Sequence, residues 1–140
     1  MKKFALLFFL ALSGLVQSQE KLTRILFVFD ASNSMNQKWG DESRFNTAKR
    51  ILSQSVDSLR NVPNLELGLR VYGHQSPVTA SYQDCADTKL EVPFSADNHA
   101  FILSKIRSLR AKGTTPIARS LEAAAGDFPD STSRNIIILI

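Results

Sequence analysis

Two strongly apolar runs constrain the fold of this 140-residue chain more than any other feature. Residues 23–29 read Thr-Arg-Ile-Leu-Phe-Val-Phe, and residues 134–140 read Arg-Asn-Ile-Ile-Ile-Leu-Ile. Continuous apolar runs of strand length are typical of strands that are buried on both faces of a parallel sheet. Such a sheet needs covering helices, so the two runs favour an α/β fold.

The segments between these runs alternate between helix and strand patterns. Ser43 is a candidate helix N-cap, and apolar residues follow it at three- and four-residue spacing, which predicts an amphipathic helix of about 16 residues. Its inward-facing residues are Phe45, Ala48, Leu52, Val56 and Leu59. Residues 65–72 alternate between apolar and polar or small side chains, as a strand does. Residues 89–94 form a shorter strand, which Pro93 places at an edge of the sheet or ends, because proline cannot donate to a strand ladder.

Two further helices are expected before the final strand. Asp97 or Ser95 would cap the first, and Pro129 would follow the end of the second. The residues expected to face inward are Phe101, Ile102, Ile106 and Leu109 in the first helix, and Ile117, Leu121, Ala124, Ala125 and Phe128 in the second. This order of elements predicts a doubly wound, mostly parallel open sheet of Rossmann-like type with one antiparallel edge strand.

The first 18 residues have the pattern of a secretory signal peptide. Lys2 and Lys3 precede an apolar stretch over residues 4–16, which at about 13 residues is shorter than the ~20 that a membrane-spanning helix needs. We therefore expect an exported protein, located in the periplasm, on the cell surface or outside the cell. One domain over 19–140 is expected to continue beyond Ile140, because the terminal strand has no following helix to cover it, so the fold would be truncated at its C-terminus.

The charge of the chain excludes some classes of partner. Removing Lys2 and Lys3 lowers the formal charge from +4 to +2, and the remaining charges alternate in sign. This pattern indicates neither a nucleic-acid surface nor a polybasic membrane patch, and we expect no membrane span after the leader. The single cysteine, Cys85, is buried and inert, pairs with another chain, or has a partner beyond the sequence given.

A set of oxygen ligands follows the first apolar strand. The loop opens with Asp30-Ala31-Ser32-Asn33-Ser34, which has one carboxylate and two hydroxyls at alternate positions. Ligands of open α/β sheets bind beyond the carboxyl ends of the strands, where this loop lies. Oxygen ligands suit a hard cation such as Mg²⁺ or Ca²⁺, and the absence of an adjacent His or Cys disfavours zinc.

These residues resemble the metal-ion-dependent adhesion site of von Willebrand factor type A domains. Asp30, Ser32 and Ser34 match its Asp-x-Ser-x-Ser motif, and Met35 continues a frequent Ser-Met ending. Gly113-Thr114-Thr115-Pro116 matches the distant loop that supplies a threonine in this family. A third element, an Asp after the fourth strand, would fall beyond Ile140. Tyr72-Gly73-His74 with Asp84-Cys85 is similar to a bacterial exported subgroup.

The resemblance implies a role for each residue. Ser32 and Ser34 would bind the cation directly, Thr115 directly or through water, and Asp30 would act through water or hold the hydroxyls. The cation would be Mg²⁺, with Ca²⁺ and Mn²⁺ as alternatives. An open coordination position would accept a carboxylate from a protein partner, or from another domain of the same polypeptide. The expected function is thus a non-enzymatic binding module.

Other interpretations compete with this one. Asp30 and Ser32 could form an ordinary turn, and Thr115 could be a helix N-cap with Pro116 in the first helical position. A strand that ends in Asp also resembles haloacid dehalogenase-like phosphatases, in which Asp30 would attack phosphorus, yet Ser32 stands where a second Asp is expected. A structural or assembly domain with a degenerate metal site is the third possibility. His74 and His99 lack partners at metal spacing, so packing roles are expected for them.

Overall fold

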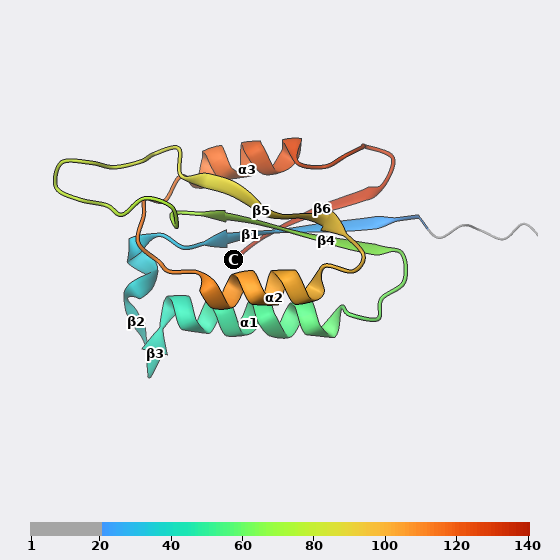
Figure 1. Cartoon of the computed structure of the whole chain (residues 1–140), viewed down its shortest axis with the longest axis horizontal. Helices are drawn as coiled ribbons and strands as arrows, with labels where there is room; N and C mark the ends of the chain where they lie inside the picture. Colours follow the sequence, from blue (N-terminus) through green and yellow to red (C-terminus); the bar gives the residue numbers. More distant parts are fainter. Residues whose placement is uncertain (1–20) are drawn as a thin grey trace, which may run out of the picture.

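The computed structural model describes residues 21–140 and has a four-stranded sheet between two layers of helices (Figure 1). The strands are β1 (Thr23–Asp30), β4 (Leu65–Tyr72), β5 (Thr88–Ser95) and β6 (Arg134–Leu139), in the order β5-β4-β1-β6. β4 and β6 pair in parallel with β1, and β5 pairs antiparallel with β4. The predicted fold class, including one antiparallel edge strand, is confirmed. The predicted signal peptide lies outside the described residues.

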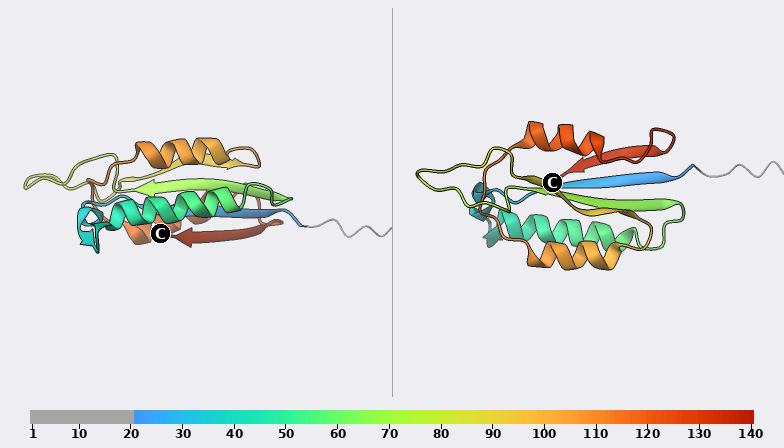
Figure 2. Two further views of the ribbon diagram at one scale, coloured as in Figure 1. Left: turned by 90° about the horizontal axis from the view of Figure 1, so that it is seen from below. Right: turned by 45° about the horizontal axis from the view of Figure 1, so that its top comes forward.

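The helices cover the two faces of the sheet. α1 (Arg44–Ser58) and α2 (His99–Ser108) lie side by side on one face, and α3 (Ile117–Gly126) lies on the other, as Figures 1 and 2 show. Within residues 21–140, none of the helices has the length and apolar character needed to cross a membrane.

β1 is the central strand, and both of its faces are buried. Phe27 and Phe29 belong to the larger core cluster, which lies on the side of α1 and α2. Leu26 and Val28 belong to the smaller cluster, which includes Ala124 of α3. Successive side chains of a strand point to opposite faces, so a fully apolar strand needs a helix layer on each side. The prediction for the first apolar run is therefore confirmed.

Within residues 21–140, β6 does not share this burial, as expected for a strand that no following helix covers there. Ile137, Ile138 and Leu139 are 36%, 37% and 45% exposed. β6 lies at the edge of the sheet beside β1, while α2 and α3 pack mainly over β4 and β5 (Figure 2). The apolar run thus predicted the strand correctly, and within the described residues this strand lies at the edge of the sheet.

The predicted inward faces of the helices are partly confirmed. The α1 stripe is buried from Phe45 to Val56, and α2 buries Ile102, Ile106 and the following Leu109. Phe101 is 72% exposed, because it precedes the buried Ile102 by one position and faces away from the sheet. In α3, Ala124 is buried, whereas Ile117 and Ala125 are exposed, contrary to the prediction.

The helix ends also differ from the sequence patterns. Ser43 caps α1 as predicted, since its Oγ accepts a hydrogen bond from Asn46 N at 3.2 Å. α2 instead follows Asn98, whose Nδ2 donates to the carbonyl oxygens of Leu67 and Pro93 at 2.5 and 2.8 Å. Neither Asp97 nor Ser95 is the N-cap, because the buried Asn98 fixes the chain between β5 and α2. α3 ends at Gly126, before the predicted Pro129 boundary.

The loop after β1 contains more structure than was predicted. It forms a short 3-10 turn, η1 (Asn33–Asn36), and a small hairpin of β2 (Lys38–Trp39) and β3 (Glu42–Ser43). Gly40 turns this hairpin with φ +69°. Trp39 is 69% exposed, so it is not packed into the core.

Two buried arginines lie on the α3 face of the sheet, and the hydrophobic pattern did not predict them. Arg70 forms a bidentate pair with Asp127, with both N–O distances 2.7 Å. Arg24 donates to Glu66 and Asp130, each at 2.6 Å. Buried arginines need such partners because an unpaired buried charge is strongly destabilising.

A third ion-pair cluster links β5 to α2 and is centred on Glu91. Its carboxylate contacts Lys105 Nζ at 2.7 Å, His74 Nε2 at 2.9 Å and Lys89 Nζ at 3.2 Å. Burial acts to raise the pKa of Glu91, but hydrogen bonds from these neighbours outweigh it and lower the pKa from 4.5 to about 2. The ionised carboxylate is therefore the form that stabilises the fold.

Glu91→Gln should flatten the acid limb of the stability profile. A carboxyl with a lowered folded-state pKa stabilises the protein fully above its ordinary pKa, and this contribution is lost as the pH falls from 4.5 to about 2. Urea unfolding over this range should show the wild type losing more stability than the variant. The exposed Glu122 provides the control, and Glu122→Gln should follow the wild-type profile. Parallel profiles for wild type and Glu91→Gln would contradict the assignment.

Candidate metal centre

The candidate site lies where β1 and β4 end side by side. Their parallel register places Asp30 opposite Tyr72, and Ala31 N donates to Tyr72 O at 2.9 Å. Tyr72 is buried, and this burial, followed by the charge of Asp30 and a hydrogen bond to it, raises the pKa of the Tyr72 phenol. The phenol therefore stays protonated beside the Asp30 carboxylate at neutral pH.

The structure brings together the three residues of the Asp-x-Ser-x-Ser motif. Asp30 Oδ1 accepts a hydrogen bond from Ser32 N at 2.7 Å, which fixes the carboxylate over the loop. The two serine hydroxyls, Ser32 Oγ and Ser34 Oγ, lie 3.1 Å apart. Ser32 is buried and Ser34 is exposed, so the pair lies at the boundary between the core and solvent.

The 3-10 turn accounts for the closeness of the serines. Met35 N donates to Ser32 O at 3.0 Å, and Gln37 N donates to Ser34 O at 3.1 Å. Met35 packs against the larger core cluster and thereby holds the turn on the core. The ordinary-turn interpretation is correct for the backbone, and this turn presents both hydroxyls together.

A distant segment pairs with this loop. Ser32 and Gly113 form an isolated parallel bridge, in which Asn33 N donates to Gly113 O at 2.8 Å. Lys112 N donates to Ala31 O at 3.1 Å. The segment that carries the predicted threonine thus runs directly alongside the Asp-x-Ser-x-Ser loop.

Thr115 lies two residues beyond this bridge, and its side chain is exposed. It does not cap α3: the N-cap is Pro116, α3 starts at Ile117, and no side chain makes a cap hydrogen bond there. The capping interpretation is therefore wrong. Ile117 N instead donates to the Thr115 carbonyl at 2.9 Å, and buried Ser120 Oγ donates to Pro116 O at 2.8 Å.

The geometry of the hydroxyl pair fits a hard cation. With metal–oxygen distances of about 2.1 Å, adjacent ligands of octahedral Mg²⁺ lie about 3 Å apart, close to the distance between the Ser32 and Ser34 hydroxyls. Within residues 21–140, no cluster of three or more His, Cys, Asp or Glu side chains has a metal-binding arrangement. A cation at this end of the sheet would have the two serine hydroxyls as ligands, with Asp30 as the adjacent carboxylate.

Several residues that shape the site were not assigned by the sequence analysis. Gly73 N donates to Asp87 O at 3.0 Å, and Gly73 O accepts from Gly113 N at 2.8 Å. Thr114 Oγ1 donates to the carbonyl of Asp84. Glycine directly after a strand is the one local sequence signal among these, because it often marks a position of positive φ, and Gly73 has φ +70°.

Cys85 is exposed and free in the described chain, so the interpretation of it as buried and inert is wrong.

Gly73 allows the loops of the site to approach each other. A Cβ atom at this position would lie 2.4 Å from Thr114 O and 2.7 Å from Ser32 Cα, far inside van der Waals contact. The backbones of the two ligand-bearing loops therefore meet at a glycine that accepts no side chain.

Gly73→Ala should destabilise the protein more than Gly40→Ala does. Both glycines have positive φ, +70° and +69°, so backbone strain is matched, but a Cβ at Gly40 would meet nothing within 4 Å. Overpacking at Gly73 should add about 2 kcal/mol to the loss, measured by urea unfolding. Equal losses for the two variants would show that the loops adjust freely.

Comparisons with known proteins agree with this architecture. A model of the von Willebrand factor type A domain matches residues 25–140. Among curated proteins, the uncharacterized protein YwmD of Bacillus subtilis is 28% identical to this chain, in an alignment that covers 84% of it. The uncharacterized protein YwmC of the same organism is 25% identical, over 83% of this chain. The chain spans about half of these relatives, 54% and 52% of their lengths.

Solved structures show the same fold at low sequence identity. The PilB minor pilin from Streptococcus sanguinis has a TM-score of 0.68 at 18% identity, covering 87% of this chain and 30% of the pilin. The three N-terminal domains of the type V pili tip protein Mfa5 from Porphyromonas gingivalis give a TM-score of 0.66 at 22% identity, covering 85% of this chain and 19% of the solved chain. At these identities the likeness establishes the fold.

Proposed function

Because the chain belongs to the von Willebrand factor type A domain family, we propose that its Asp30–Ser34 loop and Thr115 form a metal-ion-dependent adhesion site. The observation that carries the proposal is the pair of serine hydroxyls 3.1 Å apart beside Asp30, with the Thr115 segment bridged to Ser32. The cation would be Mg²⁺, with Ca²⁺ and Mn²⁺ as alternatives.

The residues have distinct roles in this proposal. Ser32 and Ser34 bind the cation through their hydroxyls, and Thr115 supplies a hydroxyl directly or through water. Asp30 balances the charge from a position fixed by the hydrogen bond from Ser32 N. When bound, the cation offers a Lewis-acidic position to an oxygen ligand. Since most of these ligands are neutral, the site keeps positive charge to attract a carboxylate.

The partner in this proposal is a protein that presents a Glu or Asp side chain. It is either a separate protein or another domain of the same polypeptide. The pilus proteins with the same fold support an adhesion or assembly role, and the leader pattern at residues 1–18 supports export. The function is binding rather than catalysis, since Ser32 stands where the phosphatase mechanism needs a second carboxylate.

Metal titration of the full chain tests the site. Mg²⁺, Mn²⁺ and Ca²⁺ should each raise the melting temperature in a concentration-dependent way, since a ligand of the native state stabilises it. Ser32→Ala/Ser34→Ala should weaken the affinity at least tenfold, which corresponds to about 1.4 kcal/mol of binding free energy. Thr115→Ala should weaken it too, with little change in metal-free stability because its side chain is exposed.

Ser131→Ala is the matched control for this experiment. Ser131 is exposed just before β6, at the opposite end of the sheet from the candidate site, and its loss should leave the metal response intact. A wild-type melting temperature unaffected by all three cations would refute the adhesion site and leave an assembly domain with a degenerate site. Phosphatase turnover that Asp30→Asn abolishes would indicate the enzyme instead.

A further inference from the structure

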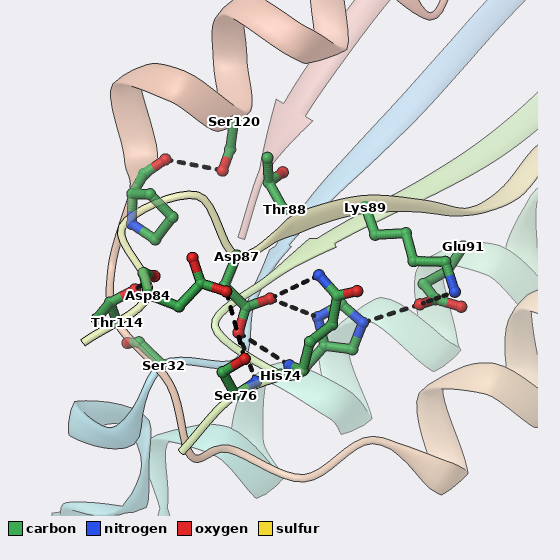
Figure 3. Close-up of polar contacts among 12 residues, drawn as sticks. Ser32, His74, Ser76, Asp84, Asp87, Thr88, Lys89, Glu91, Thr114 and Ser120 are labelled. Carbon is green, nitrogen blue, oxygen red and sulfur yellow. Dashed lines mark hydrogen bonds and ion pairs between the residues drawn. The ribbon is translucent and has the colours of Figure 1, made fainter. Parts of the chain in front are cut away.

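The loop over residues 73–87 joins β4 to β5 and is fixed by one buried carboxylate. Asp87 Oδ2 accepts hydrogen bonds from Gln75 N at 2.9 Å and Ser76 N at 3.1 Å, and Oδ1 accepts from Gln75 Nε2 at 2.9 Å. The Asp87 side chain is fully buried. Figure 3 shows these bonds converging on Asp87 from the start of the loop. One side chain thus holds the two ends of the loop together.

The charge of Asp87 is satisfied mainly by neutral donors. Burial acts to raise its pKa, but the hydrogen bonds from Gln75 and Ser76 and the nearby His74 outweigh this effect and lower the pKa below 3.8. His74 Nδ1 lies 3.7 Å from Asp87 Oδ1, while His74 Nε2 contacts Glu91. Asp87 is therefore an ionised group, and both of its carboxylate oxygens accept hydrogen bonds from within the 73–87 loop.

This loop in turn holds the segment that carries Thr115. Gly113 N donates to Gly73 O at 2.8 Å, and Val78 N donates to Lys112 O at 2.9 Å. The Asp87 carboxylate lies directly against Gly113, because a Cβ atom there would come within 2.8 Å of Asp87 Oδ2. Gly113 is therefore enclosed between the 73–87 loop and the Ser32 bridge.

The two adjacent threonines are used differently as a result. Thr114 Oγ1 donates to the carbonyl of Asp84, within the 73–87 loop, as their adjacent positions in Figure 3 allow. The Thr115 side chain is exposed. Thr114 is thus held on the 73–87 loop, and Thr115 is the threonine whose side chain is left exposed.

We infer that Asp87 is a positioning residue for Thr115: it closes the 73–87 loop, and this loop fixes Gly113 and Thr114 so that the Thr115 hydroxyl stays available beside the serines. The inference rests on the proposed cation site for its functional meaning. Its structural part, the dependence of the 112–115 backbone on Asp87, is independent of any metal. Asp87 touches none of the proposed ligands itself.

Amide hydrogen exchange on the metal-free full chain tests the structural part. Asp87→Asn replaces one acceptor oxygen with a donor, and should speed exchange at Lys112 and Gly113 at least tenfold while leaving β1 amides unchanged. Asp127→Asn is the matched control, since Asp127 is also a largely buried carboxylate that accepts two hydrogen bonds, but from Arg70 on the α3 face. Exchange at Lys112 and Gly113 that is no faster in Asp87→Asn than in Asp127→Asn overturns the inference.

If Asp87→Asn fails to fold, a second pair of variants tests whether the 112–115 backbone is coupled to the 73–87 loop. Gly113→Ala keeps the Asp87 charge but forces the two loops apart, whereas Gly126→Ala adds a methyl group that meets nothing within 4 Å. Faster exchange at residues 112–115 in Gly113→Ala alone supports the coupling, and equal exchange in the two variants overturns it.

The functional part is measured by Mg²⁺ titration of the same proteins. Asp87→Asn should weaken Mg²⁺ binding about tenfold, by about 1.4 kcal/mol, with Asp127→Asn close to wild type. Unchanged affinity in Asp87→Asn overturns the positioning role even if exchange is faster. If the wild type binds no Mg²⁺, the proposed adhesion site fails, and the exchange result still decides whether Asp87 controls the 112–115 backbone.

Discussion

The double burial of β1 is the constraint on which the rest of the structure depends. Its apolar residues require one helix layer on each face of the sheet, and its pairing with β4 fixes where the two strands end. That register places Asp30 beside Tyr72 and brings the loops after β1 and β4 to one edge. The site is thus a consequence of the sheet, since the loops only have to continue from strand ends that are already aligned.

The sequence predicted the elements better than their surroundings. Apolar periodicity located β1, β4 and α1, because it reflects burial along a single element. It misjudged Phe101, since the exposure of a helix residue depends on which neighbours cover it. It also missed the buried Arg24 and Arg70, because the acidic residues that pair with them lie far away in the sequence. Single-element patterns carry no information about such pairings.

The same distinction applies to the candidate site. Asp30, Ser32 and Ser34 are local to one loop, so their juxtaposition followed from the motif and the strand before it. Thr115 is about eighty residues away and was assigned through a family resemblance, and the structure then placed its segment beside Ser32. Asp87 had no such resemblance to identify it, because its role arises from backbone donors that only the folded loop brings together.

The carboxylates of Asp87 and Asp30 share one feature: each accepts hydrogen bonds from backbone N–H groups of its own loop. Asp87 accepts hydrogen bonds from its own loop, and Asp30 accepts a hydrogen bond from Ser32 N. Carboxylates satisfied in this way fix the backbone without surrounding a cation with full negative charges. If the proposed cation binds the neutral hydroxyls, most of its charge remains for a ligand outside the domain. The hydrogen bonds that organise the loops would thereby also make the site attractive to an acidic partner.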